Sequence, residues 1–138
     1  MLKLENVSFK VDVDGRNLEI IDNVNIEVPD GAFTVITGPN GGGKSTLARL
    51  IMGIEKPTSG RILYNDIDIT NLSVTERAKL GIGYAFQQPP RFKGLTVRRL
   101  LSLAAGSELP VDECCGYLTS VGLCSKDCLL YTSPSPRD

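Results

Sequence analysis

The chain has 138 residues, of which 41% are hydrophobic and 22% charged, as is ordinary for a soluble globular domain. Fifteen basic residues stand against 16 acidic ones, so the chain lacks the strongly basic balance of nucleic-acid-binding proteins and we expect no nucleic-acid partner. No apolar run approaches the ~20 residues that a membrane span needs, and the N-terminus has no apolar signal core. We therefore expect a cytoplasmic protein, or one held peripherally at the membrane through a partner.

The first predicted elements are β-strands. Apolar residues alternate with polar ones in residues 2–13 and again in residues 18–28, and this spacing of two indicates strands. Turn-forming residues separate the two stretches and follow the second. The next run, residues 32–37, is apolar and β-branched, which is typical of a buried parallel strand.

The rest of the chain predicts helices and short strands. Leu47, Leu50 and Ile51 share one helical face, which predicts a helix over residues 44–52, and Gly53 can end it. The other predicted elements are short strands at residues 61–64 and 82–86 and helices at residues 73–80, 96–105 and 112–121. This order predicts an α/β fold with an antiparallel β part at the N-terminus.

A glycine-rich loop lies between the strand at 32–37 and the helix at 44–52, and it fits the pattern G-x-x-x-x-G-K-[ST]. Glycines let several backbone N–H groups wrap closely around a polyphosphate and supply positive φ angles. The helix N-terminus that follows favours an anion further. The residues of this predicted phosphate loop are Gly38, Pro39, Asn40, Gly41, Gly42, Gly43, Lys44, Ser45 and Thr46.

Individual residues of the phosphate loop have distinct predicted roles. Lys44 should reach the β- and γ-phosphates of ATP as a mobile positive charge, and the Ser45 hydroxyl should ligate Mg²⁺. Thr46 is placed to contact the α-phosphate side. The loop therefore predicts ATP and Mg²⁺ as cofactors, with Lys44 as a catalytic residue.

Together with residues 81–89 (GIGYAFQQP), the phosphate loop resembles the ATP-binding cassette (ABC) family. The separation of Lys44 from Gln87 and the turn at residues 57–62 are also similar to that family. The resemblance implies a P-loop NTPase core of ABC type at residues 1–95, with the phosphate loop and the Q-loop. It implies the start of a helical subdomain at residues 96–127.

The resemblance assigns a role to Gln87, which matches the glutamine of the family's Q-loop. That residue ligates Mg²⁺ or positions the attacking water, and it links the core to the helical subdomain. Gln88 is the alternative if the register differs by one residue. The resemblance also implies a second ABC ATPase subunit, which closes over the nucleotide in a sandwich dimer.

Three parts of the family pattern do not occur in the chain: an LSGGQ-like signature, an apolar strand ending in Asp-Glu, and a switch histidine. In the family these parts come later. Since hydrolysis requires acidic residues that hold Mg²⁺ and orient water, we expect a truncated domain that does not hydrolyse ATP alone, whereas the full-length parent does.

Three functions remain open. The first is the ATPase subunit of a membrane transporter, the commonest type in the family. The second is a soluble ATPase of iron–sulfur cluster assembly (Suf type) acting on a scaffold. This type is suggested by residues 84–87 and by Val11, which stands where transport members carry an aromatic residue that stacks on adenine. Phe9 is the candidate to replace that aromatic residue. The third is a nucleotide-binding regulator without turnover.

The remaining features have simpler interpretations. The spacing of Cys114, Cys115, Cys124 and Cys128 favours reduced structural thiols over a metal site. The basic residues Arg91, Lys93, Arg98 and Arg99 favour a solvated face over a partner-docking surface. Residues 128–138 change character abruptly, and a DNA string that encodes them in order resembles a transposase adapter used in sequencing libraries, so we expect a non-native tail.

Overall fold

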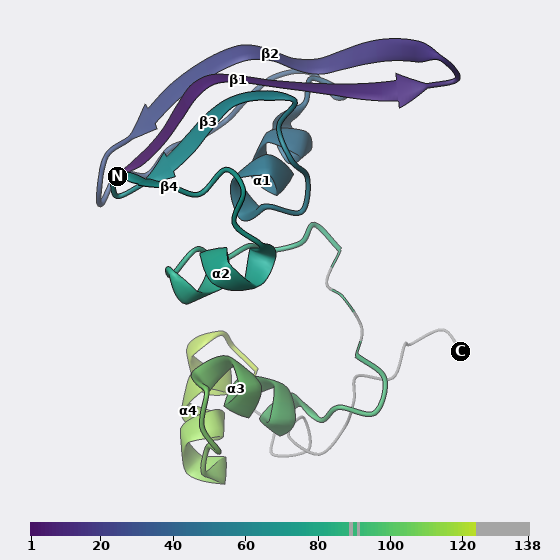
Figure 1. The fold of residues 1–138 in the computed structure, drawn as a ribbon. Helices are drawn as coiled ribbons and strands as arrows, with labels where there is room; N and C mark the ends of the chain where they lie inside the picture. The colour runs from purple at the N-terminus through teal and green to yellow at the C-terminus, as the bar shows by residue number, and fades with distance from the viewer. Residues whose placement is uncertain (89, 91, 124–138) are drawn as a thin grey trace. The chain divides into compact units, whose positions relative to one another are not determined.

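A computed structural model describes residues 1–88, 90 and 92–123. They fall into two compact units that divide between Ala85 and Phe86, and Figure 1 shows their elements. The predicted non-native tail, with Cys124 and Cys128, lies outside the described residues. In chain order the elements are β1 (Leu2–Val13), β2 (Arg16–Val28), α1 (Lys44–Met52), β3 (Ser59–Tyr64), β4 (Ile67–Asp68), α2 (Val74–Lys79), α3 (Val97–Ala105) and α4 (Val111–Ser120).

The first unit is built on an antiparallel sheet in the order β2-β1-β3-β4. Strands β1 and β2 form a long hairpin, in which Leu2 pairs with Val28 at the open end. Its turn is stabilised by the Gly15 N–H, which donates to Asp12 Oδ1 over 2.9 Å. Strand β3 pairs with the other edge of β1. The sheet confirms the predicted antiparallel β part of the N-terminus.

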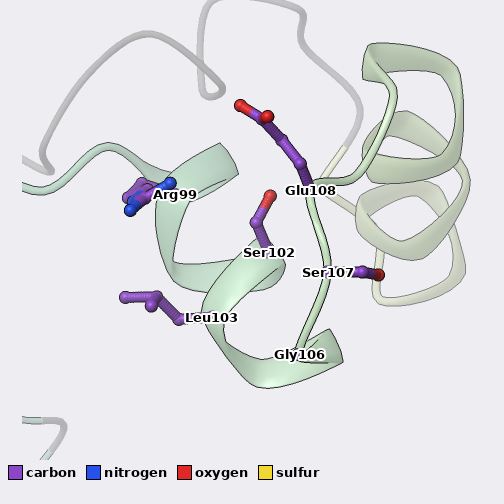
Figure 2. Close-up of a pocket in the computed structure, with 6 residues that line it drawn as sticks. All are labelled: Arg99, Ser102, Leu103, Gly106, Ser107 and Glu108. Carbon is purple, nitrogen blue, oxygen red and sulfur yellow. The ribbon is translucent and has the colours of Figure 1, made fainter.

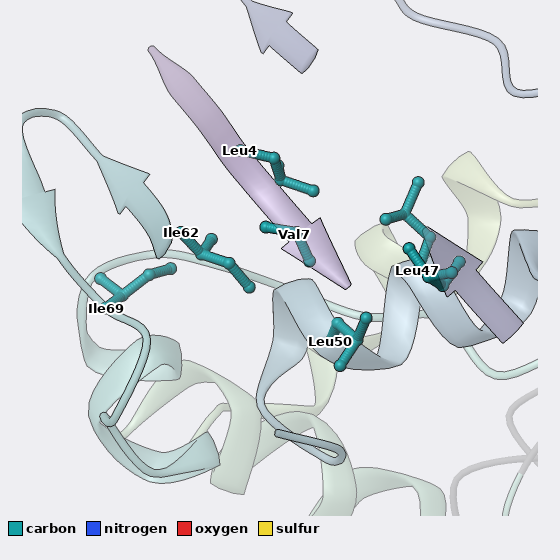
Figure 3. Close-up of a cluster of buried hydrophobic side chains, with 7 residues drawn as sticks. Leu4, Val7, Leu47, Leu50, Ile62 and Ile69 are labelled. Carbon is teal, nitrogen blue, oxygen red and sulfur yellow. The ribbon is translucent and has the colours of Figure 1, made fainter. Parts of the chain in front are cut away.

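One hydrophobic cluster joins the sheet to α1. Helix α1 contributes Leu47 and Leu50, and Ile51, the third apolar residue predicted for this face, is half-buried and packs against the cluster. Figure 3 shows the side chains of Leu47 and Leu50 approaching those of β1. The cluster of buried residues consists of Leu4, Val7, Ile21, Leu47, Leu50, Ile62 and Ile69. Each such side chain contributes roughly 1.5–3 kcal/mol on burial, so this cluster fixes the helix that follows the phosphate loop.

Helix α2 begins with a capping box. The Glu76 N–H donates to the Ser73 hydroxyl over 3.3 Å, and the Ser73 N–H donates to Glu76 Oε2 over 2.8 Å. These reciprocal bonds satisfy two backbone donors that a helix start leaves open. The bond from the Ser73 backbone holds the pKa of Glu76 below its ordinary value, with the Ser73 hydroxyl adding to the effect.

The second unit holds α3 and α4, which pack through the buried residues Leu109, Cys114 and Leu118. Thr96 caps α3, since its side chain accepts from the Arg99 N–H. Both helices lie within one residue of their predicted bounds. Cys114 is buried, Cys115 is half-buried, and both are free thiols.

Two predicted strands are not formed. Residues 32–37 and 82–86 have no strand assignment, and Phe33 is 94% exposed. A strand is held by hydrogen bonds to a neighbouring strand, and none of the four strands within the described ranges pairs with either segment. These apolar runs thus have the composition of buried strands, but no neighbouring strand among the described residues pairs with them.

Candidate phosphate-binding site

The phosphate loop leads directly into α1. Gly43 is the N-cap of α1 in a left-handed conformation, with φ 78° and ψ 2°, and provides no side-chain cap. The first bond of the helix runs from the Leu47 N–H to the Gly43 carbonyl over 2.8 Å. The N–H groups of the three preceding residues lie before that bond, where no helical carbonyl is available to them. The helix therefore begins with several donors directed toward the loop.

The loop before α1 is a tight turn. The Gly42 N–H donates to the Pro39 carbonyl over 3.1 Å, and a Cβ on Gly42 would lie 3.1 Å from the same oxygen. Gly38 and Gly41 have positive φ angles of 152° and 84°, which disfavour other residues. The glycine spacing therefore matches the backbone that the structure adopts.

Lys44 folds back over the loop. Its Nζ donates to the carbonyl oxygens of Gly38 over 2.8 Å and Pro39 over 2.6 Å. Both acceptors are neutral, so the ammonium charge stays uncompensated among these contacts. A cation on the same short segment as several backbone N–H donors provides the charge and hydrogen bonds that a polyphosphate requires.

The residues that follow Lys44 extend this donor set. Ser45 is exposed and Thr46 is half-buried, and both lie in the first turn of α1. A hydroxyl oxygen is a suitable ligand for Mg²⁺, which prefers oxygen donors and retains part of its water shell. The residues present thus fit ATP with Mg²⁺: the loop amides and Lys44 would hold the phosphates and Ser45 would hold the metal.

Gln87 belongs to the second unit and is exposed, as is Gln88. The phosphate loop belongs to the first unit. The shared role of Ser45 and Gln87 as Mg²⁺ ligands therefore stays a prediction.

Two features of the site have no counterpart in the sequence analysis. A Cβ on Gly43 would lie 2.9 Å from the Ile20 carbonyl oxygen and 2.8 Å from Ile21 Cδ1, so the loop packs directly on β2. Arg77 of α2 is fully buried and is the largest such side chain among the described residues. An arginine in a short helix ordinarily predicts an exposed charge, so the local pattern gives no signal for it.

Residues near the predicted adenine contact lie in β1. Val11 pairs with Leu18 of β2, and both Val11 and Phe9 are half-buried. Phe9 packs against the hydrophobic cluster of the first unit. This packing gives Phe9 a structural role, and its contact with adenine stays a prediction.

The predicted basic cluster is divided among different environments. Arg98 is half-buried and its Nε donates to the Leu109 carbonyl over 3.2 Å, Lys93 is exposed, and Arg91 lies outside the described residues. Arg99 lines an open pocket of about 260 Å³, which Figure 2 shows beside α3. None of the residues that line this pocket is a predicted site residue, so its volume carries no functional assignment.

Two further observations concern metals and membranes. Within the described ranges, no group of three or more His, Cys, Asp or Glu side chains is arranged to hold a metal ion. None of the helices in that part of the chain combines the length and apolar character of a membrane span.

Comparison with known sequences places these features in context. A family model described as ABC transporter matches residues 21–127. An ABC transporter ATP-binding protein of Methanocaldococcus jannaschii is 44% identical over 115 residues, which cover 82% of this chain and 44% of that protein. A methionine import ATP-binding protein of Histophilus somni is 45% identical over 89 residues, which cover 63% of this chain and 26% of that protein. A sulfate/thiosulfate import ATP-binding protein of Synechocystis sp. is 42% identical over 89 residues, covering 64% of this chain and 24% of that protein. The chain thus spans less than half the length of these relatives.

Solved structures show the same likeness. A dimeric ATP-binding cassette in a post-hydrolysis state, bound to ADP and phosphate, matches with a TM-score of 0.71 and 30% identity over 83% of this chain and 52% of that one. A nucleotide-free ATP-binding cassette from an ABC transporter matches with a TM-score of 0.64 and 35% identity over 85% of this chain and 45% of that one. These matches confirm the predicted α/β fold class, a P-loop NTPase core of ABC type.

Proposed function

Because the chain belongs to the ABC transporter family, we propose that the full-length protein is the ATP-binding subunit of a membrane transporter and hydrolyses ATP to drive it. The observation that carries this proposal is the phosphate loop, which presents the first N–H groups of α1 and the Lys44 ammonium on one short segment. That donor set suits the phosphates of ATP. The methionine and sulfate/thiosulfate import relatives support a transporter as the setting.

Within this function the described residues bind ATP and orient it. The Lys44 ammonium exchanges the Gly38 and Pro39 carbonyls for phosphate oxygens, a charge-assisted contact that is stronger than the neutral bonds it replaces. The Ser45 hydroxyl would hold Mg²⁺, and Gln87 would supply a second ligand or orient the attacking water. Bound there, Mg²⁺ would supply positive charge that offsets the charge developing on the phosphoryl oxygens. Gln87 also links the core to the helical subdomain, residues 96–127, so that this subdomain responds to the state of the bound nucleotide.

The partners follow from the same family. A cassette dimer bound to ADP and phosphate is among the similar structures, which supports pairing of the full-length protein with a second ABC ATPase subunit across the nucleotide. Closure of this dimer is proposed to act on a membrane subunit. The protein then works on the cytoplasmic side of the membrane. No contact of the described residues favours the two alternatives, a Suf-type ATPase acting on a scaffold and a regulator without turnover.

Affinity purification of the tagged full-length protein from detergent-solubilised cells tests the transporter proposal. We expect an integral membrane protein to co-purify in a fixed ratio and to change the rate of ATP turnover, because domain closure is coupled to it. The matched control is the same tag on the Lys44→Ala variant, which should retain the partner and lose turnover. Recovery of a soluble scaffold complex with no membrane subunit would contradict the proposal and favour the Suf-type alternative.

A further inference from the structure

Arg77 joins three segments of the first unit through one buried guanidinium. Its Nη1 donates to the carbonyls of Leu50 over 2.7 Å and Ile51 over 2.8 Å, both in the last turn of α1. Its Nη2 donates to the Thr70 carbonyl over 2.9 Å, and its Nε donates to the Leu72 carbonyl over 3.1 Å. All four acceptors are backbone oxygens, so Arg77 holds main chain rather than other side chains.

The position of this cation suits the end of α1. The last carbonyls of a helix lack helical partners and carry partial negative charge, and Arg77 provides donors to two of them. Gly53, which ends α1, lies so close that a Cβ there would be 2.8 Å from Arg77 Nε. Burial lowers the pKa of Arg77 and the nearby Asp68 opposes that shift, but an arginine remains charged in a protein.

The anchored segment is also hydrogen-bonded to the sheet. The Thr70 hydroxyl accepts from the Ile62 N–H of β3 over 2.9 Å and donates to Asp68 Oδ1 over 2.6 Å. Arg77 thus connects the end of α1 with a segment that the sheet also holds. Bonds of this kind transmit a displacement of α1 to its neighbours, since the planar guanidinium has a fixed arrangement of donors.

One end of this connection belongs to the proposed nucleotide site, and the other lies on the segment that precedes Gln87 in the chain. Helix α1 begins at the phosphate loop, and α2, which carries Arg77, leads along the chain to Gln87. Arg77 therefore connects the helix that follows the phosphate loop with residues 70–72 and with α2. The Arg77 side chain hydrogen-bonds both to α1 and to the segment at residues 70–72.

We infer that Arg77 is a positioning residue that couples the phosphate-loop helix to the segment leading to Gln87, so that binding of a nucleoside triphosphate orders both. This inference rests on the proposed function, since it assumes that the loop binds ATP. It assigns Arg77 no contact with the nucleotide. Its role is to make the phosphate-loop helix and residues 70–85 respond together.

Hydrogen exchange measured by mass spectrometry on the 138-residue chain tests this coupling, with and without Mg²⁺ and a slowly hydrolysed ATP analogue. In the unaltered chain the analogue should slow exchange in peptides from residues 38–48 and also from residues 70–85, the latter by about fivefold or more. In Arg77→Met the phosphate-loop peptides should stay protected by the analogue while the protection of residues 70–85 is lost. Arg77→Lys should restore part of it, because the charge remains but the fork of donors does not.

Two control variants separate coupling from simple stability. Arg49→Met removes another cation from the last turn of α1, an exposed one, and should leave the response of both peptides intact. Ile69→Ala destabilises the hydrophobic cluster of the first unit without removing a hydrogen-bond donor. Its folded fraction should still show slower exchange in both peptides when the analogue binds. If Arg77→Met fails to fold, Arg77→Lys is compared with Ile69→Ala at equal stability.

The outcomes are distinct. Protection of residues 70–85 in the folded Arg77 variants equal to that in the unaltered chain would overturn the inference, as would a parallel loss of both responses that Ile69→Ala reproduces. Analogue binding in the unaltered chain without any effect on residues 70–85 would also overturn it and leave the proposed function standing. An unaltered chain that does not bind the analogue at all would remove both.

Discussion

Lys44→Ala should reduce ATP turnover by the full-length protein on the order of 10²–10³-fold, the effect of removing one charged or hydrogen-bonding contact from a transition state. The reason lies in the position of the Lys44 ammonium, whose contacts are two neutral loop carbonyls, Gly38 and Pro39. No other cation of the phosphate loop is available to replace it. A phosphate-release assay on the purified protein measures the effect.

The fold should survive this substitution. Lys44 is not part of the hydrophobic cluster of the first unit, so the midpoint of thermal unfolding should remain nearly unchanged. Lys56→Ala is the matched control, because Lys56 is an exposed lysine of the same unit outside the loop, and it should leave turnover intact. Near-normal turnover by Lys44→Ala, with the control behaving as expected, would contradict the phosphate-loop assignment.

Gly43→Ala should destabilise the first unit by about 2–4 kcal/mol, the sum of a left-handed backbone penalty and overpacking. Gly43 has a φ of 78°, which an alanine adopts only at a cost. The added methyl group would also stand 2.9 Å from the Ile20 carbonyl oxygen, a backbone atom that cannot move aside alone. Urea unfolding monitored by circular dichroism measures the loss.

Gly41→Ala separates the two contributions to that loss. Gly41 has a similar φ of 84°, but a Cβ there has no heavy atom within 4 Å. This variant should therefore show only the backbone penalty, about 1–2 kcal/mol. Equal destabilisation by Gly43→Ala and Gly41→Ala would show that the loop does not pack on β2 as closely as the structure indicates.

Local patterns predicted the helices well. The helix at residues 44–52 coincides with α1, because a leucine face at helical spacing and a glycine C-cap are both encoded within a few residues. The capping box that begins α2 is equally local. Thr96 caps α3 for the same reason. Such signals need no knowledge of the rest of the fold.

Strands depend on distant residues, and here the sequence was a poorer guide. The alternating pattern of residues 2–13 predicted a strand, and β1 has neighbours on both edges. Residues 32–37 have a stronger apolar pattern, yet they form no strand among the described residues. Period and composition describe the segment alone, whereas a ladder requires a second segment at the correct register.

The site shows the same division. The spacing of Gly38, Gly43 and Lys44 predicted the phosphate loop, because the pattern states which backbone and charge are needed at each place. The contact of Gly43 with β2 and the burial of Arg77 depend on residues that are far apart in the chain. Arg77 binds carbonyl oxygens, which every residue possesses, so its partners leave no mark in the sequence.

Calorimetric titration of Mg²⁺ and ATP into the 138-residue chain tests the central claim most directly, since the phosphate loop is complete within the described residues. We expect saturable binding of one nucleotide per chain that weakens without Mg²⁺, is lost in Lys44→Ala and persists in Lys56→Ala. Absence of binding by a chain that circular dichroism shows to be folded, or equal binding by Lys44→Ala, would contradict the assignment of residues 38–46 as the ATP site.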